Sequence, residues 1–419
     1  MPVNDVIVAP PWRRWLPVVV WTATIWAAIP VMRALQQLFT RFLPKEAIGW
    51  FVLAAIAGGA IVAAVAVRRA RGRIDPITVA IIAGTGTVLA VWTVHLWREP
   101  AEAFHFVQYG VLGVLLFRAL RPVRPDLSSH LAAAVAGLLL GTVDEVLQWL
   151  TPGRFWDLRD IVINGSAATL VQPALWRLAP PVRPLRPRAL RLPLALVAAE
   201  LILLTLCFSA TPARLERLAD RIPSLAYLTT LTNTMAEYGH LHTIPGVGSF
   251  RSRLTRAELD ELDRTRSADV AAILDRYPPS KYGRFLRDVR PGVDPFVYEA
   301  RVHIFARDAN WAEALKLEPG SPARRRRMTV ALREQQILET VFGRTLTASI
   351  HATPSGAIEQ ARAEMDPDLA FTSRAGAHLI VGISEPRLRL LLLAGAALAG
   401  LGALALRSGR TTPATGGGT

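Results

Sequence analysis

The chain has 419 residues, of which 51% are apolar, and a formal net charge of +15. The apolar residues are concentrated in blocks of roughly 20, the length that a helix needs to cross a bilayer, which excludes an ordinary soluble protein. A strongly basic chain can bind nucleic acid. Here, however, the arginines stand at the ends of the apolar blocks, as in membrane proteins, and we expect no nucleic-acid partner.

The apolar blocks predict an all-α polytopic membrane protein with about eight transmembrane helices. The first block lacks the short apolar core and cleavage site of a secretory signal, so we expect it to be retained as a helix. The single cysteine, Cys207, permits no internal disulfide. The predicted spans are residues 15–32, 49–67, 77–97, 103–118, 130–150, 160–176, 192–209 and 390–406.

The connections between these blocks differ in charge. Taken alternately, one set holds 16 arginines and the other holds six arginines and lysines. Because short connections rich in Lys and Arg stay in the cytoplasm, both termini are predicted to be cytoplasmic. The long polar region at residues 210–386 then lies on the extracytoplasmic side, since a long domain crosses largely regardless of its charge.

Three predicted helix ends on the outer side carry polar side chains at helical spacing, in "AEAFHFVQYG", "DEVLQW" and "WDLRDIVIN". The last two are joined by "TPGR", in which Pro and Gly favour a turn. An unpaired carboxylate at this depth costs about 1–3 kcal/mol, so these side chains should face other protein. They predict a ligand-binding site formed by His105, Tyr109, Asp144, Glu145, Gln148, Arg154, Asp157, Asp160 and Asn164.

The same pattern is compatible with a hydrogen-bonded plug that only locks the helix ends together, because structural networks also bury carboxylates. The pair Gly137 and Gly141 in "GLLLG" predicts a close approach of two helices near this site. Glu200 lies near the middle of a predicted span, too deep to join the outer site. It indicates either a functional group or a protonated side chain bonded to a neighbouring helix.

The ordered motifs "HFVQYG", "EVLQ" and "PGRFWDLRDIVINGS" resemble those of the VanZ-like family of bacterial membrane proteins. The resemblance covers about residues 77–178 and places the family pattern on His105, Phe106, Tyr109, Glu145, Gln148, Pro152, Gly153, Arg154, Asp160 and Asn164. It implies a location in the bacterial plasma membrane. It also implies a link to cell-wall lipid intermediates and to resistance against the glycopeptide teicoplanin, because the founding member is associated with that resistance. The family brings no settled chemistry.

The polar region is predicted to be a mainly helical or α+β domain. "TRAELDELDRTRSADVAAILDRY" has the capping-box spacing at Thr255 and Glu258, and "SPARRRRMTVALREQQILETVFG" predicts a second amphipathic helix. "FVYEARVHIFAR" and "AHLIVGIS" alternate as strands do. His240 and His242 are too few to define a metal site, and Arg324 to Arg327 are expected to form a solvated helix face rather than a headgroup contact. No metal or cofactor is expected.

These features divide the chain into five parts, and the 210–386 domain is a candidate surface for an envelope protein partner. The parts are two N-terminal spans at 1–76, a VanZ-like core at 77–178, a basic loop with the seventh span at 179–209, the outer domain at 210–386, and the last span with its tail at 387–419.

Four functions remain open from the sequence. The first is binding of a membrane lipid or cell-wall precursor headgroup at the outer site. The second is a membrane-embedded hydrolase or transferase, with Glu145, His105 or Asp160 as catalytic candidates and Glu145 as the acid or base. The third is a lipid or small-molecule transporter, and the fourth is a scaffold for the outer domain. Whether the protein is an enzyme stays open.

Overall fold

The structure is a computed structural model that describes residues 12–97, 99–229, 234–291, 293–352, 355–375 and 382–408. The chain forms two compact units, one of residues 1–207 with 389–419 and one of residues 208–388. The boundaries lie within two residues of those predicted for the polar region.

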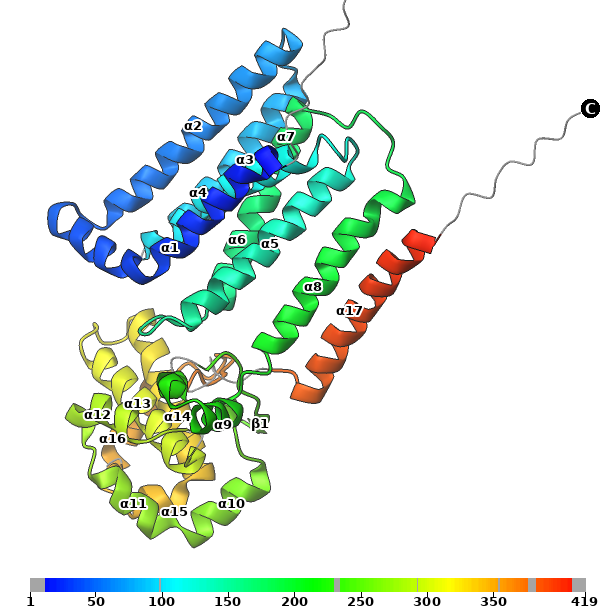
Figure 1. The fold of residues 1–419 in the computed structure, drawn as a ribbon. Coiled ribbons are helices and arrows are strands. Elements are labelled where there is room, and N and C mark those ends of the chain that lie inside the picture. The colour runs from blue at the N-terminus through cyan, green and yellow to red at the C-terminus, as the bar shows by residue number, and fades with distance from the viewer. Residues whose placement is uncertain are drawn as a thin grey trace, which may run out of the picture. The chain divides into compact units, whose positions relative to one another are not determined.

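The first unit, here called the membrane unit, is a bundle of helices (Figure 1). Its helices are α1 (Trp12–Phe42), α2 (Glu46–Arg71), α3 (Pro76–His95), α4 (Pro100–Leu120), α5 (Ser128–Trp149), α6 (Leu158–Leu170), α7 (Gln172–Leu178), the 3₁₀ turn η1 (Pro187–Leu190), α8 (Arg191–Cys207) and α17 (Glu385–Ser408).

Seven helices among the described residues are long and apolar enough to cross a membrane. The sixth predicted span is divided, because α6 ends at Leu170 and α7 begins at Gln172 with Pro173 in its first turn. The α6–α7 pair still covers the full depth of the bundle. Asn164 in α6 contacts His105 near the start of α4, and Arg177 in α7 contacts Asp75 before α3. The fold is the all-α polytopic one that was predicted, with seven continuous helices and one broken crossing.

The close approach predicted for "GLLLG" is confirmed between α5 and α6. A Cβ atom built on Gly141 would come within 2.6 Å of the Asn164 Cβ, and one on Gly165 would come within 2.6 Å of Leu138. At Gly141 the contacted atom is a Cβ fixed to its backbone, so only hydrogen fits there. The small residues therefore let the two backbones come close and hold Asn164 against the end of α5.

In the residues that the structure describes, the second unit is mainly helical with one antiparallel hairpin. Its helices are α9 (Pro212–Arg221), α10 (Arg256–Thr265), α11 (Ser267–Asp275), α12 (Tyr282–Asp288), α13 (Pro295–Leu315), α14 (Pro322–Val341), α15 (Gly343–Thr347) and α16 (Ser355–Glu364). It also has the 3₁₀ turns η2 (Pro223–Thr229) and η4 (Pro279–Lys281), and the paired strands β1 (His240–Ile244) and β2 (Gly248–Ser252). Helices α13 and α14 form the centre of its core, which contains Phe296, Ile304, Ile337 and Leu338.

The strand prediction for "FVYEARVHIFAR" is wrong, because these residues form the first half of α13. The polar residues in the alternating pattern do not face water. Arg301 donates to the Tyr277 carbonyl, and His303 lies 2.7 Å from Glu334, so these polar side chains are buried too. Asp294 accepts from the Val297 amide and begins a helix instead.

The two amphipathic segments are helical as predicted. The Thr255–Glu258 capping box is present at the start of α10, and the helix then breaks before α11. The "SPARRRRM" segment begins α14, where Ser321 accepts from the Arg324 amide. Most of the second predicted strand, "AHLIVGIS", lies outside the described residues.

Candidate functional site

The α4 side of the predicted site is formed by His105 and Tyr109, which stack at 6.2 Å between ring centroids. The His105 Nδ1 lies 2.8 Å from the Asn164 Oδ1, and its Nε2 lies 4.0 Å from the Asp160 Oδ2. The Tyr109 hydroxyl faces the Asp144 carboxyl. One helical face of α4 therefore reaches both α5 and α6, as the spacing of four residues predicts.

The end of α5 is tied together by Gln148. Its Nε2 donates to the Glu145 Oε1 at 2.6 Å and to the Asp144 Oδ2 at 3.4 Å, and its Oε1 accepts from Arg154. The second Glu145 oxygen accepts from the Asp157 amide at 3.1 Å. Both Glu145 oxygens are thus occupied by protein donors, and Glu145 holds the start of α6 against the end of α5.

The turn between α5 and α6 positions the two arginines. Gly153 has φ of 80°, a left-handed conformation that glycine adopts readily, and it reverses the chain before Arg154. The Asp157 side chain accepts from the Arg159 amide at 2.8 Å and so begins α6. Arg159 pairs with Glu102 at the start of α4. The Asp157 carboxylate therefore serves as a helix cap, and Glu102 joins the site although it was not among the predicted residues.

The structure brings all nine predicted residues together, but several of their buried polar atoms have no partner within the protein. The Asp144 side chain is only 2% exposed and the Asn164 side chain is fully buried, whereas His105 and Asp160 are 15% and 16% exposed. The site is therefore reached from the side of His105 and Asp160. Its unpartnered buried atoms are the Asp144 Oδ1, Asp160 Oδ1, Glu102 Oε2 and Asn164 Nδ2.

Glu200 lies apart from this outer site. Its Oε1 is 2.7 Å from the Thr142 hydroxyl, and that hydroxyl also lies 3.2 Å from the Leu138 carbonyl. A hydroxyl has one hydrogen, so both contacts are hydrogen bonds if a protonated Glu200 donates to Thr142. The geometry matches the sequence-based alternative of a bond to a neighbouring helix, here between α8 and α5.

A second polar cluster lies at the opposite end of the bundle, and the sequence analysis did not predict it. Arg177 donates to Asp75 at 2.6 Å, and the Gln172 Oε1 accepts from the His130 Nδ1 at 3.2 Å. The pKa of Asp75 is held well below its ordinary value, chiefly by the hydrogen bond from the Thr78 amide. The Thr78 hydroxyl and the Arg177 guanidinium lower it further. The Asp-Pro start of "DPITVA" is a helix-capping signal that could have identified Asp75.

The candidate residues of the second unit form no comparable site. The His242 Nε2 lies 2.9 Å from the Leu254 carbonyl, and His240 is exposed. Within the described ranges, no group of three His, Cys, Asp or Glu side chains is placed to hold a metal ion. Arg324 is buried and pairs with Glu364 at 2.6 Å, so it does not belong to the expected solvated face, while residues 325–327 are exposed.

Comparison with known proteins identifies the region that contains the outer site. The VanZ/LLP1 family model matches residues 52–174. No curated protein and no solved structure matches the chain. The chain is therefore a multi-pass membrane protein that contains a VanZ-like region. The match begins inside α2, one helix earlier than the resemblance read from the sequence motifs.

Proposed function

We propose that the outer site binds the headgroup of a lipid-linked cell-wall intermediate at the extracytoplasmic face of the plasma membrane. The observation that carries the proposal is the set of four unpartnered buried atoms, three carboxyl oxygens and one amide nitrogen, from α4, α5 and α6. An unpartnered buried polar atom costs about 1–3 kcal/mol, so a ligand that supplies the missing partners is favoured.

The atom types indicate the chemistry of the ligand. The three carboxyl oxygens accept hydrogen bonds and suit the hydroxyl or amide groups of a sugar. The Asn164 Nδ2 donates and suits a carbonyl or hydroxyl oxygen. Arg154, at the mouth of the turn, has a planar guanidinium suited to a phosphate group. A headgroup that combines sugar and phosphate matches this set.

The charge of the two bundle ends supports the proposed side. One end carries the arginine-rich starts and ends of the helices, including Arg68, Arg121 and Arg177, and the other carries the acidic site. By the arginine rule, the acidic end faces away from the cytoplasm. Cell-wall lipid intermediates and glycopeptide antibiotics meet on that side. Competition for a wall precursor is the route by which we expect the protein to reduce teicoplanin action.

Asn164→Ala tests the proposal against the matched control Gln172→Ala, which removes a buried amide at the opposite end. The probe is a water-dispersible polyprenyl-diphosphate disaccharide, with binding to the full-length protein followed by native mass spectrometry. We expect Asn164→Ala to weaken binding about five- to tenfold, the value of one or two hydrogen bonds, and Gln172→Ala to leave it unchanged. Equal affinity in both variants and the wild type would contradict the proposal.

A hydrolase or transferase is the second candidate, and one contact favours it. If the Asn164 Oδ1 accepts a hydrogen bond from His105 Nδ1, the His105 Nε2 faces Asp160 at 4.0 Å. This distance is too long for a hydrogen bond between the two side chains. A ligand group placed between them could exchange a proton with either one. Glu145 would then position the turn rather than transfer a proton. The same probe incubated with the protein should yield a product that Asp160→Asn abolishes; an unchanged probe removes this candidate.

A further inference from the structure

A hollow in the membrane unit lies between α2, α3, α4 and α7, on the face of α4 that carries Phe106, Val107 and Val111. It encloses about 240 Å³. Of the eighteen described residues that line it, Thr85 is the only one with a polar side chain, and its hydroxyl lies 3.4 Å from the Leu170 carbonyl. The hollow therefore offers a ligand almost no polar partner.

Two glycines leave this space rather than close a helix contact. A Cβ atom built on Gly59 in α2 would meet no atom within 4 Å, and one on Gly86 in α3 would meet only Ile56, at 4.0 Å. At Gly141 and Gly165, between α5 and α6, the same construction meets a side chain at 2.6 Å. The glycines between α5 and α6 thus allow close helix packing, whereas those of α2 and α3 at the hollow leave open space.

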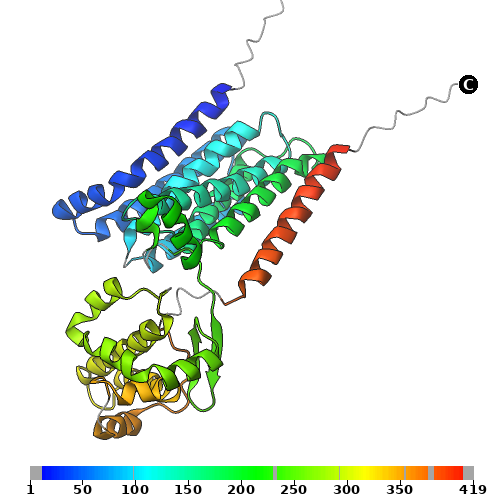
Figure 2. The same ribbon diagram turned by 60° about the horizontal axis from the view of Figure 1, so that its bottom comes forward.

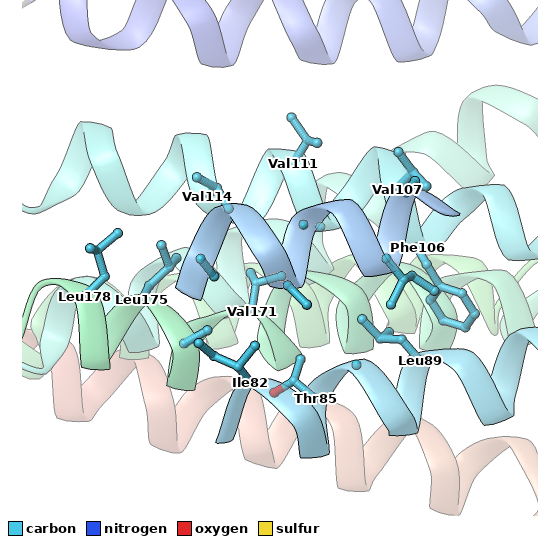
Figure 3. A pocket seen from close by; sticks show the side chains of 18 residues that line it. Ile82, Thr85, Leu89, Phe106, Val107, Val111, Val114, Val171, Leu175 and Leu178 are labelled. Carbon is cyan, nitrogen blue, oxygen red and sulfur yellow. The ribbon is translucent and has the colours of Figure 1, made fainter. Parts of the chain in front are cut away.

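The hollow is elongated and open to the surface of the bundle. Phe106 and Leu178 lie at opposite ends, and Val107, Val111 and Val114 follow one side (Figure 3). The α4 residues from 106 to 114 extend over roughly 12 Å at ~1.5 Å per residue. Val111 is 38% exposed and Gly59 is exposed, so the opening faces the hydrocarbon of the bilayer.

We propose that this hollow, named here the chain pocket, binds one hydrocarbon chain of a membrane lipid. A headgroup or a soluble polar ligand would leave its polar atoms without partners there, and water requires two or more polar partners to stay. An empty hollow forfeits dispersion contacts that a chain restores. The pocket lies at the depth of the lipid tails, since its α4 residues begin six positions after Pro100. The proposal does not depend on the outer site.

The test uses full-length protein in nanodiscs that contain phosphatidylglycerol with a diazirine in the middle of one acyl chain. After photolysis, peptide mass spectrometry maps the labelled residues. In the wild type we expect label on Ile82, Val111 and Leu175, from three different elements around the pocket. Gly59→Leu should fill the pocket and reduce that label about fivefold or more, because the leucine side chain would occupy the space that the lipid chain needs.

Gly58→Leu is the matched control, because Gly58 neighbours Gly59 on α2, is exposed and also has no atom within 4 Å of an added Cβ. Gly86→Leu with its control Gly84→Leu repeats the comparison on α3. Equal labelling in filling and control variants overturns the proposal. Label confined to outward residues such as Val62 overturns it too, as does a second copy of the chain cross-linked across the pocket.

Two further measurements complete the labelling experiment. If the leucine variants fail to give monodisperse protein, the wild-type map alone decides, and absence of label from Val111 and Leu175 refutes the proposal. Asp144→Asn should leave pocket labelling unchanged. A loss of headgroup binding in that variant therefore bears on the proposed function and not on the chain pocket.

Discussion

Two clusters of buried polar side chains, one at each end of the membrane unit, differ in how completely they are hydrogen-bonded. At the arginine-rich end, no buried side-chain nitrogen or oxygen lacks a partner in the cluster of Asp75, Thr78, His130, Gln172 and Arg177. In the outer site at the acidic end, the Glu102, Asp144, Asp160 and Asn164 side chains each have one such atom without a partner. A closed network is complete as a structural tie between helices, whereas an open one can accept hydrogen bonds from a further component.

The same contrast exists inside the acidic end. Glu145 and Gln148 are fully engaged and join α5 to the turn, while Asp144 and Asn164 each keep one unpartnered atom. Residues that belong to one motif therefore have different tasks. Under the proposed function, the first pair positions the site and the second pair faces the ligand. These two contrasts give three predictions, from the largest expected effect to the smallest.

Gln148→Leu should have the largest effect, because it removes the donor shared by Asp144 and Glu145. Two buried carboxyls would each lose a hydrogen bond, and we expect the free energy of unfolding to fall by about 2–5 kcal/mol. Thermal unfolding in detergent, followed by tryptophan fluorescence, measures this. A variant as stable as the wild type would show that the hydrogen bonds of Gln148 do not stabilise the end of α5.

Asp144→Asn should separate stability from binding. The change keeps the side-chain volume and removes a buried charge, so stability should stay constant or rise by about 1 kcal/mol. Binding of the polyprenyl-diphosphate disaccharide should fall roughly tenfold, since a hydrogen bond with a charged acceptor is lost. Lower stability with intact binding would place Asp144 with the structural residues instead.

Asp75→Asn should give the smallest effect, and the effect should depend on pH. The pKa of Asp75 is lowered in the folded protein, chiefly by the Thr78 amide, so its stabilising contribution is complete above the ordinary Asp value of about 3.9. The contribution is lost as the pH falls below that value towards the lowered folded pKa. The difference in melting temperature between wild type and variant should therefore be constant from pH 7 to 5 and shrink below pH 4. A difference independent of pH would indicate that the Asp75 charge is not involved.

Much of the membrane unit follows from the sequence because its signals are strong and local. Apolar blocks set the spans, and a spacing of three or four residues puts side chains such as His105 and Tyr109 on one face. "GLLLG" identified the close contact of α5 with α6. The family match to residues 52–174 agrees with the motifs quoted from the sequence.

The sequence could not show which atoms of the site are already used. Glu145 looked like the best acid or base, but its oxygens are bonded to Gln148 and the Asp157 amide, a result of turn geometry and side-chain rotamers. Glu102 joins through Arg159, 57 residues away. In the second unit, the alternation of polar and apolar residues in "FVYEARVHIFAR" wrongly predicted a strand, because Arg301 and His303 are buried by partners from distant elements. Such pairings depend on tertiary structure and leave no periodic signal.

The return of the chain to the membrane unit has a practical consequence. Helix α17 lies beside α8 in both ribbon views, with Gly395 against Leu201 and Gly402 against Leu194, so the two helices are antiparallel (Figures 1 and 2). Residues 208–388 are thus an insertion into a helical hairpin, and both junctions fall at one end of it. A short glycine–serine loop in their place should yield a truncated transmembrane protein for separate biochemistry.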